Sequence, residues 1–144
     1  MMDRSAILLP FFGVMLLTFV VWVYMYARRL SFLLGQRIDL RTVDTRDKAD
    51  AVIPAPINFS SNNLKNLFEL PVIFYALCLY LYASSGVDRA YVAAAWCFLL
   101  FRTVHSVIHC SYNNVRHRFY AYLLSAIALW VMVIRAALSV IGVA

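Results

Sequence analysis

Acidic residues are scarce in this chain, with 7 Asp and Glu against 13 Lys and Arg in 144 residues. Charged residues of both signs make up only 14% of it, and none lies between Ala6 and Ala27. Hydrophobic residues account for 64%, and the mean hydropathy is +0.77. So little charge in so apolar a chain excludes an ordinary soluble domain and a disordered segment. We therefore expect an integral membrane protein.

Several familiar signals are also missing. The three cysteines, Cys78, Cys97 and Cys110, lie in apolar stretches without C-x-x-C spacing, which favours packing over disulfide or redox roles. A net charge of +6 could suggest nucleic acid, but the chain has no basic tract and no RNA-type aromatic motif. The charge-free segment 6–27 exceeds the roughly 7 to 15 apolar residues of a secretory signal, and no small-residue cleavage site follows it. We expect it to be retained as a first membrane span.

The remaining apolar runs predict three further helices. A charged loop over 35–55 follows the first span, and Pro54 and Pro56 close it. No internal repeat or low-complexity tract is present, and the second and third connections are short. Short connections place neighbouring helices antiparallel. The sequence therefore predicts an all-α, integral membrane, antiparallel four-helix bundle, formed by a single domain over 1–144 with helices at 6–34, 58–83, 89–112 and 116–141.

Polar side chains refine the ends of these helices. We expect the side chain of Asn58, Ser60 or Ser61 to cap the second helix by accepting its free backbone N–H groups. Pro71 is expected to bend this helix inside the membrane. Asp88 is expected to cap the third helix.

The basic residues indicate an orientation. One side of the predicted bundle holds most of them: Arg28, Arg29, Arg37, Arg41, Arg46, Lys48, Lys65, Arg116 and Arg118. The other side holds only Arg4, Arg89 and Arg135. By the positive-inside rule, the long first loop faces the cytoplasm.

Polar groups at membrane depth mark where a function is to be sought. A charged side chain near the bilayer centre costs about 3 kcal/mol on insertion scales, so it is kept where it faces a partner, water or a ligand. On the second helix, residues at i, i+3, i+4 and i+7 share or border one face: Asn62, Lys65, Asn66 and Glu69. The third and fourth helices carry comparable sets: Arg102, His105 and His109, then Arg118 and Tyr122.

These residues permit more than one interpretation. Glu69 and Arg102 could form a purely structural ion pair. One carboxylate cannot neutralise Arg102, Lys65 and Arg118 together, however, so a cleft that gathers them would attract an anion. We also weighed a small proton-coupled transporter that titrates Glu69, but the surrounding cations would hold that carboxylate ionised.

The two histidines leave their own alternatives. His105 and His109 are spaced i, i+4 and could bind a metal, but no third ligand and no H-E-x-x-H pattern stands beside them. We therefore expect no metal. A packed, hydrogen-bonded role and direct contact with a ligand both stay open.

Two segments together resemble the MAPEG family, the membrane-associated proteins of eicosanoid and glutathione metabolism. They run from Asn62 through Lys65, Asn66 and Glu69 to Pro71, and over 102–109 with Arg118 and Tyr122 after the turn. The resemblance covers almost the whole chain and is closest to the bacterial type and to the microsomal glutathione transferases. It implies a homotrimer in the bacterial inner membrane, with glutathione held between neighbouring subunits.

The resemblance also implies an activity and a site. The activity is that of a glutathione-dependent transferase or peroxidase acting on lipophilic electrophiles or lipid hydroperoxides. Arg118 would stabilise the thiolate of glutathione, or of another low-molecular-weight thiol, because a guanidinium beside sulfur favours its ionised form. Tyr122 would join it in the catalytic set. The binding residues carried over by position are Arg28, Asn62, Lys65, Asn66, Glu69, Arg102, His105 and His109.

The chain departs from the family pattern at three of these positions. Asn62 and Lys65 stand where family enzymes often have arginine, and His109 stands where they often have tyrosine. Loss of the first arginine removes a bidentate grip on a carboxylate. Because the family also contains a non-catalytic lipid-binding protein, a lipid- or anion-binding scaffold is the alternative.

Overall fold

The computed structural model describes residues 3–142, and every regular element within them is helical. Residues 1–2 and 143–144 of the expected domain lie outside this range. Four rods are long and apolar enough to cross a membrane: Arg4–Gly35, Ala55–Ala83, Arg89–Cys110 and Val115–Val140. The prediction of an all-α membrane bundle with four spans is confirmed.

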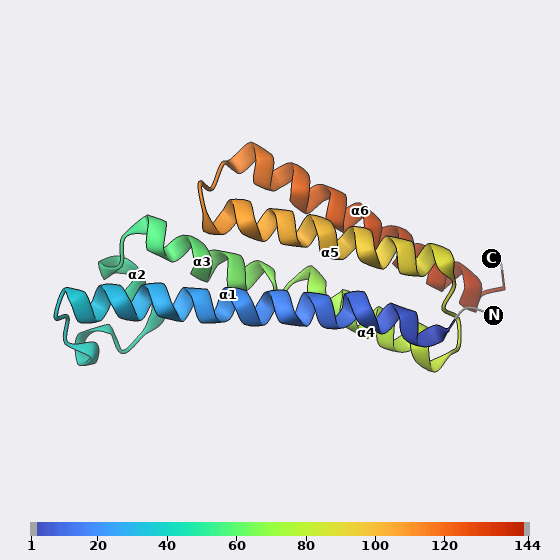
Figure 1. The fold of residues 1–144 in the computed structure, drawn as a ribbon, viewed down its shortest axis with the longest axis horizontal. Coiled ribbons are helices and arrows are strands. Elements are labelled where there is room, and N and C mark those ends of the chain that lie inside the picture. Colours follow the sequence, from blue (N-terminus) through green and yellow to red (C-terminus); the bar gives the residue numbers. More distant parts are fainter. Residues whose placement is uncertain (1–2, 143–144) are drawn as a thin grey trace.

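The first rod is a 3-10 turn, η1 (Arg4–Ile7), that leads into α1 (Leu8–Gly35). The second is made of α3 (Ala55–Asn66) and α4 (Leu70–Ala83), and the last two are α5 (Arg89–Cys110) and α6 (Val115–Val140). Figure 1 shows that α1 begins and α6 ends at the same end of the bundle, where the turn between α4 and α5 also lies. The long first loop and the turn between α5 and α6 lie at the opposite end (Figure 1).

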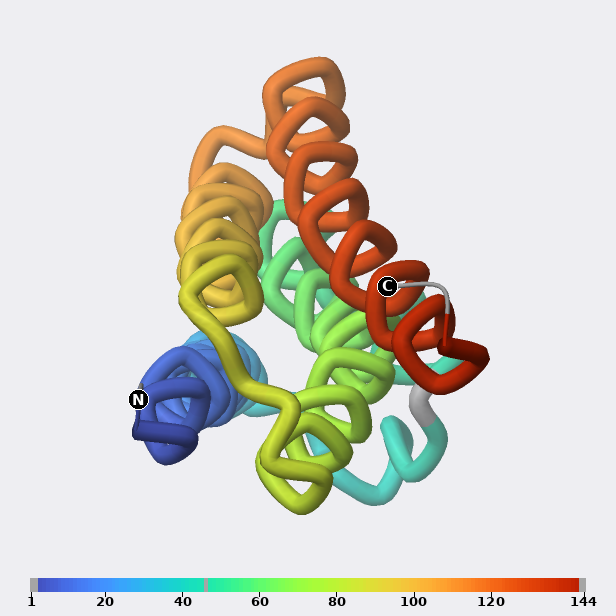
Figure 2. Tube along the Cα trace, turned by 90° about the vertical axis from the view of Figure 1, so that its right-hand side faces the viewer, coloured from blue at the N-terminus to red at the C-terminus, as the bar shows by residue number. Residues whose placement is uncertain are grey.

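The main apolar core lies in the half of the bundle nearer the ends of the chain. It combines side chains of η1 and α1 with those of α4, α5 and α6, among them Ile7, Phe74, Phe98 and Leu129, all 0% exposed. The rings of Phe74 and Phe98 stack with their centres 4.4 Å apart. Figure 2 shows α5 running beside α6, and both views place α1 beside the second rod. The other half of the bundle, around α3, is where the polar groups gather.

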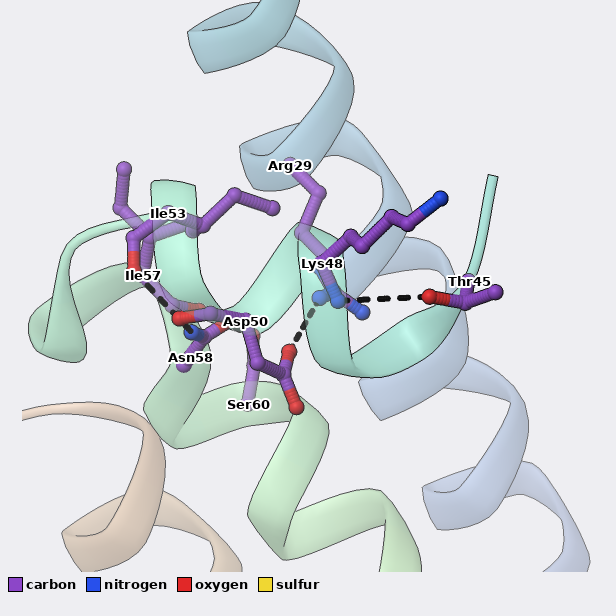
Figure 3. Close-up of polar contacts among 8 residues, drawn as sticks. All are labelled: Arg29, Thr45, Lys48, Asp50, Ile53, Ile57, Asn58 and Ser60. Carbon is purple, nitrogen blue, oxygen red and sulfur yellow. Dashed lines mark hydrogen bonds and ion pairs between the residues drawn. The ribbon is translucent and has the colours of Figure 1, made fainter. Parts of the chain in front are cut away.

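The second rod begins earlier than the sequence predicted, and its expected caps are wrong. Its first helix starts at Ala55, with Pro54 in the capping position and Pro56 in the first turn. A proline suits this place because the first N–H groups of a helix have no partner within the helix. Asn58 therefore lies inside α3, where its side-chain amide donates to the backbone carbonyls of Asp50 and Ile53 at 3.4 and 3.1 Å (Figure 3). Ser60 and Ser61 also lie inside the helix and are buried.

The rod is interrupted, whereas we expected a continuous helix bent at Pro71. The first helix ends at Asn66 and the next begins at Leu70, with Glu69 in the capping position. Pro71 stands in the first turn of α4. Its ring lacks an N–H group and would clash with the carbonyl of Leu67 in a continuous helix, so the helix stops before it. The interruption lies at membrane depth, beside the polar residues.

The long first loop is more ordered than its mixed charges suggested. It contains a 3-10 turn, η2 (Leu40–Val43), and a short helix, α2 (Arg46–Val52), whose first turn is capped by the hydroxyl of Thr45. Asp50 of α2 forms an ion pair with Arg29 of α1 at 2.5 Å (Figure 3). Ile53, which follows α2, is 3% exposed. The loop is therefore anchored to the ends of α1 and α3.

The remaining turns follow the sequence closely. Asp88 caps α5, as predicted, by accepting from the backbone N–H groups of Ala90 and Tyr91 at 3.0 Å each. Asn114 caps α6 in the same manner, and Asn113 before it has a φ of +48°. Asparagine tolerates this left-handed conformation better than most residues. This turn brings the start of α6 back against the end of α5.

Candidate functional site

A pocket of about 200 Å³ opens between α3, α5 and α6, and it gathers residues from all three predicted polar sets. Asn66 comes from α3, His105 from α5, and Arg118 and Tyr122 from α6. Its apolar lining consists of Val115 and Phe119. The turn at Asn113 and Asn114 positions the α6 residues by folding the first turns of this helix onto the last turns of α5.

Arg118 links α5 and α6 at the edge of this pocket. Its Nη1 donates to the side-chain oxygen of Asn113 at 2.7 Å and lies 2.9 Å from Nε2 of His109. A guanidinium has only donors, so the imidazole nitrogen must accept. A neutral His109 ring then carries its proton on Nδ1, which lies 3.5 Å from the side-chain Nδ2 of Asn66. Because both nitrogens are donors, this contact becomes a hydrogen bond when the Asn66 amide turns its oxygen to the ring. Asn66, His109 and Arg118 thus form a chain of polar contacts across three helices.

His105 contributes an acceptor that nothing in the described chain satisfies. It is 2% exposed, and its Nδ1 donates to the backbone carbonyl of Arg118 at 3.0 Å. In the neutral ring the other nitrogen, Nε2, therefore has a free lone pair. This atom is buried and has no hydrogen-bond partner within residues 3–142.

Arg102 contributes unsatisfied donors next to the same pocket. The residue is 0% exposed, and none of its three guanidinium nitrogens has a hydrogen-bond partner in the described part of the chain. Its guanidinium carbon lies 4.7 Å from the ring centre of Tyr122 and 5.6 Å from that of Phe98. Such cation–π contacts contribute about 2 kcal/mol when desolvated, which is less than the cost of burying an unpaired charge. A partner is needed that residues 3–142 of a single chain do not provide.

Glu69 is not that partner in this structure. It lies in the interruption between α3 and α4, its side chain is exposed, and it forms no ion pair with Arg102 among the described residues. The interpretation of these two residues as a structural ion pair therefore finds no support within one subunit. Glu69 acts on Arg102 only electrostatically and from a distance, and no carboxylate forms an ion pair with Arg102 or Arg118 among the described residues.

The structure divides the polar stripe predicted on the second rod. Asn66 faces α5, whereas Asn62 and Lys65 are exposed, as Glu69 is. Arg28 of α1 also lies outside the pocket, where its Nη1 donates to the hydroxyl of Tyr24 at 3.1 Å. Of the eight predicted binding residues, those that meet at or beside the pocket are Asn66, Arg102, His105 and His109.

Sequence reasoning missed Asn63, which occupies the inward position that it had assigned to Asn62. Asn63 is 0% exposed, donates to the sulfur of Cys110 at 3.4 Å and accepts from the hydroxyl of Ser106 at 3.4 Å. A signal was present: Ser60, Asn63 and Leu67 are spaced i, i+3, i+7, and all three are buried. These contacts hold α3 against α5 one turn before Asn66.

The histidine pair has no third potential metal ligand beside it in the described chain. No group of three or more His, Cys, Asp or Glu side chains gathers there. Nε2 of His109 faces the guanidinium of Arg118, and Nδ1 of His105 donates to a carbonyl. Both rings therefore act as hydrogen-bonding groups beside two arginines, an arrangement suited to an anionic ligand.

Comparison with known proteins identifies the fold family. The sequence matches the MAPEG family over residues 7–138, which include all of the pocket residues and nearly all of the four spans. It shows no significant match to a curated protein or to a solved structure. The four apolar rods and this match, which covers nearly the whole chain, establish that the chain belongs to the MAPEG family of multi-pass membrane proteins, which act in glutathione or eicosanoid metabolism.

Proposed function

We propose that this protein is a glutathione-dependent transferase or peroxidase that acts on lipophilic electrophiles or lipid hydroperoxides. The observation that carries the proposal is the pocket between α3, α5 and α6, where Arg118 and the nearby Arg102 bring positive charge that no ion pair among residues 3–142 neutralises. A buried cation with unsatisfied donors binds an anion strongly, because the anion restores the interactions that were lost with water.

The unsatisfied atoms fit the groups of glutathione. This tripeptide offers carboxylates, which match the N–H donors of Arg102, and N–H and S–H donors, which match the lone pair on Nε2 of His105. The side-chain amide of Asn66 can both donate and accept. A different low-molecular-weight thiol with a carboxylate, such as cysteine, would satisfy the same atoms.

Arg118 is the proposed catalytic residue. Glutathione supplies the nucleophilic sulfur, and a thiol with a pKa near 8.5 is only a few per cent ionised at neutral pH. In both side-chain contacts of Arg118 the atom involved is Nη1, which fixes the plane of the guanidinium. Nη2 and Nε take no part in these two contacts. These groups would hold the sulfur in its ionised form. Tyr122, whose ring stacks near Arg102, completes the proposed set.

We further propose that a neighbouring subunit completes the site in a homotrimer. Asn62, Lys65 and Glu69 are exposed on a rod that crosses the membrane. A charged side chain that faced lipid would cost about 3 kcal/mol, so a protein surface is expected to cover them. Arg28, at the end of α1, lies outside the pocket of its own subunit, so its proposed role in binding the thiol requires that it reach the pocket of a neighbouring subunit.

The proposed setting is the bacterial inner membrane, with the long first loop in the cytoplasm. Arg29, Arg37, Arg41 and Lys48 lie at the end of the bundle that carries this loop, and Arg116 lies there too. Basic residues in short loops near a span favour the cytoplasmic side. An oily electrophile could then reach the pocket laterally through the bilayer, past Val115 and Phe119.

The decisive experiment measures conjugation of a lipophilic aryl halide, and reduction of a fatty-acid hydroperoxide, between pH 6 and 10. The purified protein is compared with Arg118→Ala and with the matched control Arg135→Ala, an arginine of the same helix that is paired with Asp88 instead. Arg118→Ala should raise the pKa of the bound thiol, and each unit of increase should lower the rate at pH 7 by roughly tenfold. The difference in rate between the variant and the wild type should vanish above about pH 9.5, where the thiol is ionised in both. The control should retain its rate.

Three outcomes are informative. An unchanged rate in Arg118→Ala removes the proposed role of this arginine. A rate supported equally by cysteine as the only thiol would show that the tripeptide is not what the pocket recognises. Saturable glutathione binding by calorimetry without any turnover would instead assign a non-catalytic anion-binding role.

A further inference from the structure

A second pocket lies at the opposite end of the bundle from the candidate site. It has a volume of about 180 Å³, and it is formed by α4, α5, α6 and the turn between α4 and α5. Leu81 and Tyr91, which are 2% and 4% exposed, belong to its wall. The rest of its lining is mostly polar: Tyr80, Ser84, Gly86, Asp88, Arg135 and Ser139. None of these residues lines the pocket between α3, α5 and α6.

This second pocket lies at the membrane interface. Arg135 stands twenty residues after Val115, the first residue of α6. At 1.5 Å per residue the two are about 30 Å apart along the helix axis, which is the thickness of the hydrocarbon layer. Asp88 precedes α5, in the turn that joins it to α4. The pocket is therefore at the level of the phospholipid headgroups.

Arg135 keeps donors that its partner does not use. Its Nη1 donates to Oδ1 of Asp88 at 2.8 Å, and its Nη2 donates to Oδ2. A guanidinium has five N–H donors, so three take no part in this pair. The guanidinium carbon lies 4.4 Å from the ring centre of Tyr91, which holds the side chain against the pocket wall. Because this side chain is 41% exposed, a phosphate can approach the remaining donors.

Acceptors suited to a primary amine lie beside this arginine. Oδ1 of Asp88 accepts from two backbone N–H groups of α5 as well as from Arg135, whereas Oδ2 accepts from Arg135 alone among the described residues. Oδ2 therefore keeps a lone pair. The hydroxyls of Ser84 and Ser139 donate to backbone carbonyls of α4 and α6 at 3.4 and 2.8 Å, so their oxygens stay available as acceptors.

The surface of α6 offers a path for acyl chains next to this pocket. Val131 lies one turn deeper in the membrane than Arg135 on the same face, and Ile127 lies one turn beyond Val131. These two side chains are 55% and 51% exposed. Apolar surface that continues from a polar pocket at the interface favours a lipid over a soluble compound with the same headgroup.

We propose that this pocket binds the headgroup of one phosphatidylethanolamine molecule of the bilayer. The phosphate contacts Arg135, and the ammonium group donates to Asp88 and to the hydroxyl oxygens of Ser84 and Ser139. One cation and one anion line the pocket, so a zwitterionic headgroup complements it better than an anionic one. A primary ammonium has three N–H donors, whereas the quaternary ammonium of phosphatidylcholine has none. This role does not rest on the proposed thiol chemistry.

The test is native mass spectrometry of the full chain after equilibration with phosphatidylethanolamine, phosphatidylcholine or phosphatidylglycerol of equal chain length. The wild type should retain phosphatidylethanolamine preferentially. Asp88→Asn should lower its preference over phosphatidylcholine about fivefold, which corresponds to about 1 kcal/mol for a partly exposed charge pair. Asparagine keeps the helix cap, so this variant should fold. Arg135→Gln should weaken retention of both lipids, because both carry the phosphate.

Matched controls separate this site from general effects. Arg89→Gln removes an exposed charge next to Asp88 that does not line the pocket, and it should retain lipid as the wild type does. Ser139→Trp should reduce retention of both lipids by filling the pocket, whereas Val140→Trp, at the exposed neighbouring position, should not. Soluble phosphoethanolamine, which has no acyl chains, should not displace the lipid.

The proposal is overturned if the wild type retains phosphatidylcholine or phosphatidylglycerol equally well, if Asp88→Asn keeps the full preference, or if Arg89→Gln loses as much lipid as Arg135→Gln. Displacement by soluble phosphoethanolamine would assign the pocket to a free zwitterion instead of a lipid. Dissociation of the oligomer by Ser139→Trp would assign it to a contact between subunits.

Discussion

Two arginines at different levels of the bundle show how similar surroundings lead to different roles. The guanidinium carbon of Arg135 lies 4.4 Å from the ring centre of Tyr91, as that of Arg102 lies 4.7 Å from Tyr122. Arg135 also donates to both carboxylate oxygens of Asp88, one of them at 2.8 Å. Arg102 has no such partner within residues 3–142. Both arginines contact an aromatic ring, so the ring does not distinguish them. The difference is the carboxylate, which pairs Arg135 with the start of α5, whereas the donors of Arg102 are left for a ligand or a partner.

The two surroundings also differ in what encloses them. Arg135 ties α6 to the turn before α5, and its side chain and that of Asp88 are 41% and 44% exposed. Water can therefore hydrate both charges. Arg102 is fully buried between helices, where no water reaches its charge. The buried, unpaired guanidinium of Arg102 therefore destabilises the fold more than the exposed Arg135 does. It lies beside the candidate site, where an anionic ligand can supply the hydrogen-bond acceptors that residues 3–142 do not.

The largest effect on stability is expected from replacing Arg102. Methionine fills similar space without charge, and replacing buried ionic groups by apolar ones is often neutral or stabilising by about 1–4 kcal/mol. We expect Arg102→Met to unfold at a higher denaturant concentration in detergent than the wild type, but to gain no stability from added glutathione. A large loss of stability would show that the assembled protein neutralises Arg102 as Asp88 neutralises Arg135.

A smaller effect is expected where α3 is held against α5. Asn63→Leu removes the contacts with Cys110 and Ser106, and loss of buried hydrogen bonds of this kind costs about 1–3 kcal/mol. Asn62→Leu is the matched control, because Asn62 is the exposed neighbour. Denaturant unfolding of both variants should rank Asn63→Leu as the less stable. The reverse order would place Asn62, as the sequence suggested, on the inward face.

The smallest effect concerns the paired arginine. Hydrogen bonding by the Arg135 side chain, with backbone N–H donors at the start of α5, lowers the pKa of Asp88 from 3.8 to about 2. A carboxyl group with a lowered pKa contributes stability above its ordinary pKa and loses that contribution as the pH falls from about 4 to 2. Because the pair is partly exposed, we expect less than about 1 kcal/mol.

Asp88→Asn tests this expectation, because asparagine keeps the helix cap but loses the charge. The difference in unfolding midpoint between this variant and the wild type should be small at pH 6 and should shrink toward zero near pH 2. A difference that persists unchanged at low pH would show that the cap geometry, and not the charge of Asp88, stabilises this turn.

The sequence predicted the four membrane spans because each contains a long apolar run, but it did not predict the break within the second span. It also predicted that Arg102, His105 and His109 share a face, and all three are buried. On α5 the neighbouring positions are apolar, as with Val104 and Val107, which are exposed where lipid can cover them. The inward face of this helix is therefore the only polar one, and periodicity identifies it without ambiguity.

The face of α3 could not be identified in the same way. Polar residues stand at nearly every position from Asn58 to Asn66, so no apolar stripe indicates which side is inward. If the inward face is shifted by one residue, Asn63 takes the place of Asn62, and the sequence pattern fits equally well. The relation of Glu69 to Arg102 was equally hidden, because it depends on where Pro71 stops the helix.

The interruption between α3 and α4 has a mechanical consequence. Only Leu67, Phe68 and Glu69 join the two helices. The backbone N–H groups of Phe68 and Glu69 bond three residues back, to Lys65 and Asn66, so the regular α-helical pattern is broken at this point. Phe74 fastens α4 within the densely packed half of the bundle, whereas α3 rests on α5 through Asn63 and Asn66. The tilt of α3, which carries Asn66, is therefore less tightly coupled to the tilt of α4 than it would be in one continuous helix.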